Sequence, residues 1–161
     1  MATISLRSLE IAKTLSGNSP WTMDFQEAAS QTYLKGAILT FDANGRLAEA
    51  GANPTRMVGV AAEPAHNYSA TGTANTAKVW VASDDTIFVG NLSGSSVSAL
   101  TDVGGRYGVA KSTFWHVDKT VAIANARVIV IDLDSRDLIG DTNARVHFMI
   151  LSNFNVLRGT S

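Results

Sequence analysis

The sequence predicts an all-β protein with a compact, barrel-like body. The best evidence is a pair of apolar, β-branched segments at residues 127–133 and 145–151, whose side chains alternate between two faces as they do along a strand. A connection rich in Asp, Gly, Thr and Asn joins them and allows the chain to turn. Similar segments recur from Tyr33 onwards at intervals of roughly 8–12 residues, a spacing typical of β-barrels and β-sandwiches.

The composition indicates one globular domain. The chain has 161 residues, of which 45% are hydrophobic and only 17% charged, so it can build one core and leaves a weakly charged surface. The 14 acidic and 13 basic residues are mixed along the chain, and because no basic stripe follows from this pattern we expect no direct binding of nucleic acid. Cysteine is absent, which excludes disulfides and thiol chemistry.

The sequence also gives expectations about location. No segment approaches the ~20 apolar residues of a membrane span, so we expect no membrane partner. The first residues lack the apolar core of a signal peptide, and we therefore expect synthesis in a cytoplasm.

Residues 1–32 show no clean apolar period and form the first predicted unit. Two interpretations are open: a first strand with a loop packed on the body, or an extended N-terminal arm that reaches a neighbouring molecule. Trp21 follows Pro20 and precedes the clear β region, and an aromatic residue exposed there suits an anchor in a partner's pocket. The candidate contact residues of this segment are Ile4, Leu6, Leu9, Trp21 and Phe25.

Residues 33–161 form the second predicted unit, the barrel-like body. Gly36 and Gly59 interrupt apolar runs, which predicts bulges or a close approach of two backbones. The Asn-Gly pair at 44–45 predicts a tight turn, because it supplies positive φ at little steric cost. Strands are expected at 34–41, 56–61, 77–81, 86–89, 107–110 and 114–117, a surface loop at 64–76, a turn at 90–96 and a short helical turn at 97–102.

No motif indicates catalysis or a cofactor. His66, His116 and His147 lie far apart in sequence, without the short spacing of metal-ligand pairs. The glycine-rich segment 104–108 lacks the Lys-Ser/Thr ending of a phosphate loop and precedes no helix. We therefore expect a protein that is not an enzyme and that holds no cofactor.

An acidic cluster lies between the last two predicted strands. Its four aspartates do not fit a calcium loop, because the positions for a third ligand, glycine and glutamate hold Arg136, Asp137 and Asn143. We expect these carboxylates to pair with arginines or to accept N–H groups of turns. The cluster consists of Asp132, Asp134, Asp137 and Asp141.

Three motifs, taken together and in this order, resemble those of the head decoration (cement) proteins of tailed bacteriophages. The first is similar to a strand pair of that family, the second to a further block and the third to its closing hairpin. They are YLKGAILTFD (33–42) with MVGVAAE (57–63), SALTDVGGRYGV (98–109) with WHVD (115–118), and IDLDSRD (131–137) with GDTNARVHF (140–148).

The resemblance implies a β-barrel or β-tulip protein on the outer surface of a virion. It implies a homotrimer at threefold positions of an HK97-like shell, where the N-terminal arm contacts the major capsid protein. We then expect residues 2–25 to be mobile in the free protein and ordered on the capsid. Ion pairs within the body or across the trimer seam are expected among Arg127, Arg136, Arg145, Asp132, Asp134 and Asp137.

Two other functions remain open. A trimeric tail or spike component would share the low charge and the sheet content. A small β-barrel enzyme or ligand-binding protein would require polar groups that converge on one pocket, and the scattered His and Asp residues do not predict one.

Overall fold

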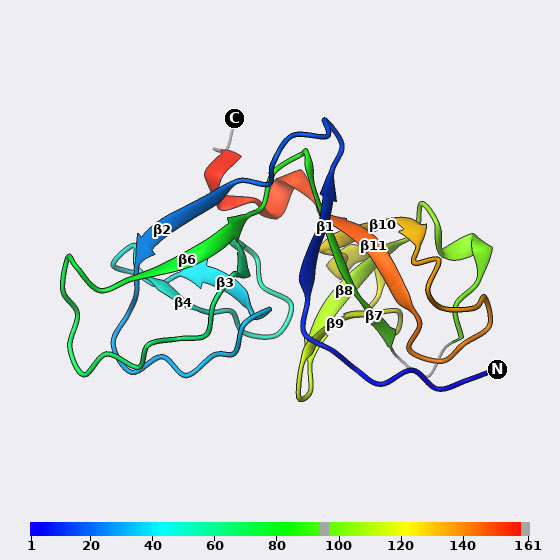
Figure 1. Cartoon of the computed structure of the whole chain (residues 1–161), viewed down its shortest axis with the longest axis horizontal. Helices are drawn as coiled ribbons and strands as arrows, with labels where there is room; N and C mark the ends of the chain where they lie inside the picture. Colours follow the sequence, from blue (N-terminus) through cyan, green and yellow to red (C-terminus); the bar gives the residue numbers. More distant parts are fainter. Residues whose placement is uncertain (94–96, 159–161) are drawn as a thin grey trace.

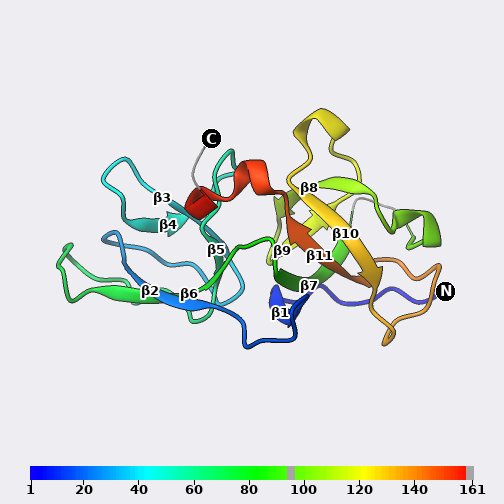
Figure 2. The ribbon, with the colours of Figure 1, turned by 90° about the horizontal axis from the view of Figure 1, so that it is seen from above.

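The computed structural model describes residues 1–93 and 97–158, and it confirms the predicted all-β fold. The described residues form eleven strands, which fall into two lobes (Figures 1 and 2). Their helices are 3₁₀ turns of three residues, and none is long and apolar enough to cross a membrane. These turns are η1 (Leu100–Asp102), η2 (Ile123–Asn125), η3 (Ser152–Phe154) and η4 (Val156–Arg158).

The first lobe, here called the sheet lobe, is an antiparallel sheet in the order β2-β6-β5-β3-β4. A parallel bridge between Glu27 and Leu47 connects the end of β2 to the start of β4, so the sheet curls towards closure. Its strands are β2 (Thr22–Gln26), β3 (Ile38–Phe41), β4 (Leu47–Glu49), β5 (Gly59–Ala61) and β6 (Thr76–Val81).

The second lobe, here called the barrel lobe, is a closed ring of five strands in the order β7-β11-β10-β8-β9. The ring closes because the end of β7 pairs in parallel with β9, where Leu92 lies opposite Val117. The first half of β7 pairs instead with β1, which lies outside the ring. The strands are β1 (Glu10–Thr14), β7 (Thr86–Ser93), β8 (Arg106–Lys111), β9 (Trp115–Asp118), β10 (Val128–Leu133) and β11 (Arg145–Ile150).

Residues 1–32 do not stand apart from the body, as a free arm would. They supply β1 to the barrel lobe and β2 to the sheet lobe (Figure 1). Leu9 is 1% exposed and belongs to the core. The first-strand interpretation therefore describes this structure. The sequence obscures these strands because a bulge between Ile11 and Lys13 breaks the period of β1, and because most of β2 is exposed.

Glycines mark the places where the N-terminal segment and the strands approach most closely. A Cβ atom on Gly36 would lie 2.6 Å from the carbonyl oxygen of Leu9, and one on Gly59 would lie 2.0 Å from that of Trp80, as their predicted roles require. Gly90 corrects a prediction. It lies within β7 and not in the predicted turn. Glycine is required at this position of the strand because a Cβ atom there would lie 2.3 Å from Cδ2 of Leu9. Residues 94–96 of that predicted turn lie outside the described residues.

The two lobes share one core. The buried apolar residues of both lobes form one cluster, and the C-terminal 3₁₀ turns lie between the lobes (Figure 2). After β11 has completed the barrel, the chain crosses back, and the amide of Met57 donates to the carbonyl oxygen of Phe154 at 2.6 Å. Members of the cluster from the two lobes include Ile38, Leu39, Val60, Phe88, Val130 and Phe148.

Candidate functional site

The most exposed group of apolar side chains lies at one end of the barrel lobe, which we call the barrel-end surface. Two loops form it, one at residues 97–105 around η1 and one at residues 134–144 between β10 and β11. Leu138 is 75% exposed, Leu100 69% and Ile139 58%. Between these loops lies an open groove of about 580 Å³, lined by Leu100, Val103, Asp132, Leu133, Asp134, Ser135, Asp137, Leu138 and Ile139.

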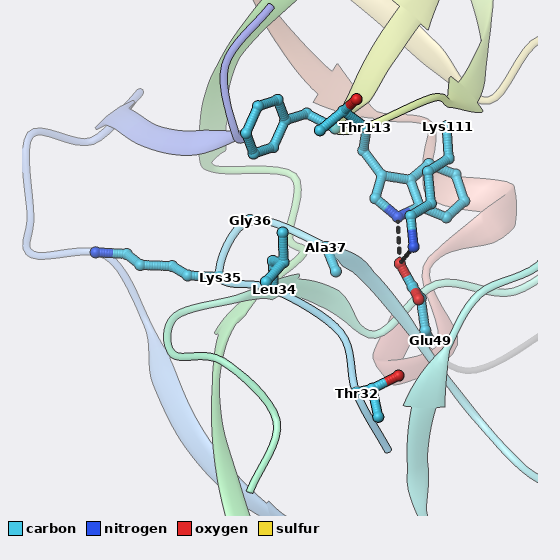
Figure 3. A pocket seen from close by; sticks show the side chains of 10 residues that line it. Thr32, Leu34, Lys35, Gly36, Ala37, Glu49, Lys111 and Thr113 are labelled. Carbon is cyan, nitrogen blue, oxygen red and sulfur yellow. Dashed lines mark hydrogen bonds and ion pairs between the residues drawn. The ribbon is translucent and has the colours of Figure 1, made fainter. Parts of the chain in front are cut away.

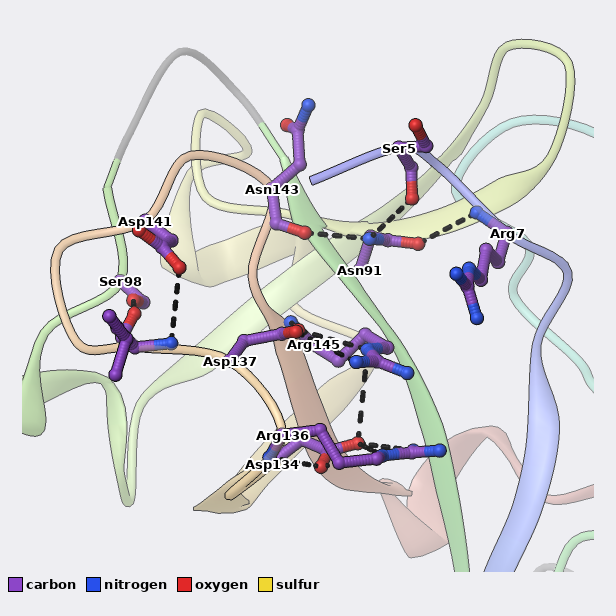
Figure 4. Close-up of polar contacts among 11 residues, drawn as sticks. Ser5, Arg7, Asn91, Ser98, Asp134, Arg136, Asp137, Asp141, Asn143 and Arg145 are labelled. Carbon is purple, nitrogen blue, oxygen red and sulfur yellow. Dashed lines mark hydrogen bonds and ion pairs between the residues drawn. The ribbon is translucent and has the colours of Figure 1, made fainter. Parts of the chain in front are cut away.

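Buried polar groups hold the loop that carries Leu138 and Ile139. The carboxylate of Asp141 is 3% exposed and accepts the N–H of Leu138 at 3.1 Å and that of Ala2 at 2.7 Å. The hydroxyl of Ser98, which lies near Asp141 (Figure 4), accepts the N–H of Gly140 at 3.1 Å and donates to the carbonyl oxygen of Leu138. The apolar side chains therefore stand on a backbone that is already ordered.

The η1 loop is fixed in the same way by Asp102, which is 2% exposed. Its carboxylate accepts the hydroxyl of Tyr107 at 2.9 Å and the N–H of Ala99 at 2.8 Å, and it pairs with Lys119 at 2.7 Å. Burial, together with the hydrogen bond to Asp102, raises the pKa of Tyr107 to about 12. Both loops of the barrel-end surface are thus anchored by a buried aspartate.

Two predicted arginines, one within the 134–144 loop and one directly after it, form ion pairs with aspartates of the loop (Figure 4). Arg145 binds Asp137 through two hydrogen bonds of 2.9 and 2.7 Å, and this lowers the pKa of Asp137. Arg136 binds Asp134, which is 4% exposed, and these hydrogen bonds lower the pKa of Asp134 to about 2. Asp132 is exposed and belongs to no ion pair of the described residues; its carboxylate accepts the adjacent N–H of Leu133.

Arg127 differs from the prediction, because no aspartate pairs with it within residues 1–93 and 97–158. Its buried guanidinium donates to the carbonyl oxygens of Pro54 at 2.6 Å, Ala126 at 3.2 Å and Asn53 at 3.3 Å. It also lies over the ring of Phe154, 4.2 Å from the centroid. Arg127, directly before β10, therefore connects the barrel lobe to the 51–56 loop of the sheet lobe.

Asn91, which fixes the N-terminal segment, was not singled out from the sequence. This side chain is fully buried in β7 and accepts the N–H of Arg7 at 2.8 Å. It also donates to the carbonyl oxygens of Asn143 at 2.6 Å and Ser5 at 3.3 Å (Figure 4). The only available signal was a polar residue within a mainly apolar segment.

The predicted contact residues of the N-terminal segment do not form one surface. Ile4 and Leu6 are half-buried beside the barrel lobe, and Leu9 is buried. Phe25 packs edge-to-face on Phe41 in the sheet lobe, with centroids 5.3 Å apart. Trp21 is 68% exposed and, with Leu157, lines a separate hollow of about 220 Å³.

A small pocket of about 40 Å³ lies where the lobes meet (Figure 3). Glu49 of β4 accepts the ammonium of Lys111 at 2.6 Å and the indole N–H of Trp115 at 2.9 Å. These bonds join β4 to the β8–β9 hairpin, and the pocket has room for about one or two water molecules. We assign this pocket to lobe packing.

The three histidines lie in separate places. His66 lies 3.5 Å from the buried carboxylate of Glu27 and 3.9 Å from Glu63, and its ring stacks on Tyr68. Burial lowers the pKa of His147, whose Nδ1 has no hydrogen-bond partner within the described part of the chain. Among the described residues, no group of three or more histidines or carboxylates is arranged to hold a metal ion.

Comparisons of the chain with protein-family models, with curated proteins and with solved structures found no match.

Proposed function

We propose that the chain is a capsid decoration protein, which stabilises an assembled viral head by bridging neighbouring major capsid subunits. The observation that carries the proposal is the barrel-end surface, where large apolar side chains are exposed on two ordered loops. Exposed apolar side chains gathered on one face are typical of surfaces that bind another protein. The resemblance of the sequence motifs to head decoration proteins is the reason for proposing the major capsid protein as the partner.

The scaffold suits binding by shape and burial. Because Asp141 and Asp102 hold both loops, little conformational entropy is lost when a partner covers Leu100, Leu138 and Ile139. Burying such a side chain is worth roughly 1.5–3 kcal/mol when it becomes fully covered. The low overall charge, with a net value of -1, permits close approach to a protein lattice.

The mechanism would be thermodynamic. A protein that binds the assembled shell, and not its separated subunits, stabilises the shell by mass action. If three copies act together at a threefold position, contacts that are weak alone combine through a high effective concentration. This mechanism makes and breaks no covalent bond, which agrees with the expectation from the sequence that the protein is not an enzyme.

The test is sedimentation of the purified protein with viral heads that lack it, and separately with isolated tails. We expect the protein to pellet with heads and to remain in the supernatant with tails. Binding to tails alone would contradict the proposal and favour the tail or spike component. Sedimentation of the protein without heads gives its oligomeric state, which we expect to be a trimer.

Two variants make the test specific to the surface. Leu138→Ser should weaken head binding, because it removes a 75% exposed apolar side chain from the groove. Ile123→Ser is the matched control, since Ile123 is also 75% exposed but lies on η2, outside the groove. Equal head binding by both variants would contradict the assignment of the barrel-end surface.

A further inference from the structure

We infer that the groove of the barrel-end surface accepts a partner segment in which a lysine or arginine stands beside large apolar side chains. The inference rests on the proposed function, because it names the chemistry that the capsid partner must present at this surface. The groove, its charges and their burial carry the argument.

The groove combines an apolar floor with an acidic wall. Leucine, valine and isoleucine side chains from both loops and from the end of β10 form the floor. The wall contains Asp132, Asp134 and Asp137, and the described residues that line the groove include no lysine or arginine. With about 580 Å³, the groove has space for several side chains of an extended segment.

The three carboxylates are not equivalent. Arg136 engages Asp134 and Arg145 engages Asp137, so these two charges are balanced within the protein. Asp132 is exposed and has no ion pair in the described part of the chain. The wall therefore presents one uncompensated negative charge beside the apolar floor.

This charge decides which segment fits. A partner that covers the apolar floor removes water from Asp132, and a carboxylate that loses water without gaining a partner opposes binding. A lysine or arginine placed beside the apolar side chains restores the lost interactions, whereas a glutamate there adds repulsion. The groove thus selects against neutral and acidic segments with the same apolar side chains.

The test uses two blocked heptapeptides, identical except that a central lysine flanked by leucines is replaced by glutamate, and ¹⁵N-labelled full-length protein observed by NMR. We expect the lysine peptide to shift the amide signals of residues 97–105 and 132–141, and to bind about tenfold more tightly than the glutamate peptide, the scale of one charged contact. Asp132→Asn should reduce this preference. Asp24→Asn, which removes an exposed carboxylate on β2, should leave it unchanged.

Several results would overturn the inference. These are equal binding of the two peptides, shifts located elsewhere on the protein, or a preference that survives Asp132→Asn. The same signals moving on dilution of the protein alone would assign the groove to a second copy of the chain. Head sedimentation keeps the two proposals distinguishable: wild-type protein that fails to bind heads refutes the decoration function, whereas head binding without peptide selectivity refutes only this inference.

Discussion

Leu9→Ala tests whether the N-terminal segment is part of the folded body. Leu9 is 1% exposed, and its side chain lies over Gly90 of β7, where the strand has no side chain of its own. Replacing a buried leucine by alanine costs about 2–5 kcal/mol, because apolar contacts are lost and a cavity remains. For a chain of 161 residues, each kcal/mol corresponds to about 3 °C in melting temperature, so we expect a decrease of about 6–15 °C.

Urea unfolding followed by tryptophan fluorescence and a thermal scan followed by circular dichroism measure this change. Leu15→Ala is the control from the same segment, since Leu15 is 61% exposed and its removal should change stability by less than about 0.5 kcal/mol. If Leu9→Ala has the same melting temperature as the wild type, residues 1–14 are not packed on the barrel in solution, and the mobile-arm interpretation is correct.

Three further predictions concern buried charge, pH and close backbone contact. Arg127→Met should lower the free energy of unfolding by about 3–5 kcal/mol, because buried carbonyl groups lose a charged donor. Arg136→Ala, at an exposed arginine that pairs with Asp134, should cost only about 1–2 kcal/mol. Equal losses in urea unfolding would refute this contrast. Because the pKa of Asp134 is lower in the folded protein than in the unfolded chain, its ion pair stabilises the fold above about pH 4 and is lost as the pH falls towards 2. The free energy of unfolding of the wild type should therefore exceed that of Asp134→Asn by about 1–2 kcal/mol at pH 6, after allowance for solvent screening of the exposed Arg136. Urea unfolding should show this difference shrinking by pH 2. A difference that does not change with pH would count against the ion pair. Gly59→Ala should lower the free energy of unfolding by more than about 2 kcal/mol, since its Cβ would lie 2.0 Å from the carbonyl oxygen of Trp80. Gly51→Ala is the control and should leave stability unchanged, because no atom lies within 4 Å of a Cβ placed there. Similar melting temperatures for the two variants would show that the close approach is absent.

Local patterns in the sequence were sufficient for the strands whose alternation is regular. The segments that became β10 and β11 were evident, because one face of each strand is buried and the other is only partly exposed. The glycine at position 59 was recognised as a close contact from its place inside an apolar run. These features depend on residues near one another in the chain, which is why the sequence alone could predict them.

Features that depend on distant parts of the chain could not be predicted. Gly90 looked like a turn residue, and only the position of Leu9 across β7 explains why glycine is required within the strand. Arg127 was expected to pair with an aspartate, but in the folded chain its guanidinium donates to carbonyl oxygens of the 51–56 loop. The candidate site was only partly foreseen: its aspartates and arginines were singled out, whereas the exposed Leu100 and Leu138 have no distinctive motif.

The central claim is that the chain stabilises an assembled shell by binding it, and head disassembly measures this most directly. Heads that lack the protein are heated with and without saturating protein, and the release of capsid subunits is followed by light scattering and sedimentation. The account predicts that subunits are released at a higher temperature when the protein is present, and that Leu138→Ser gives a smaller increase than Ile123→Ser. Release at the same temperature with and without saturating protein would contradict it.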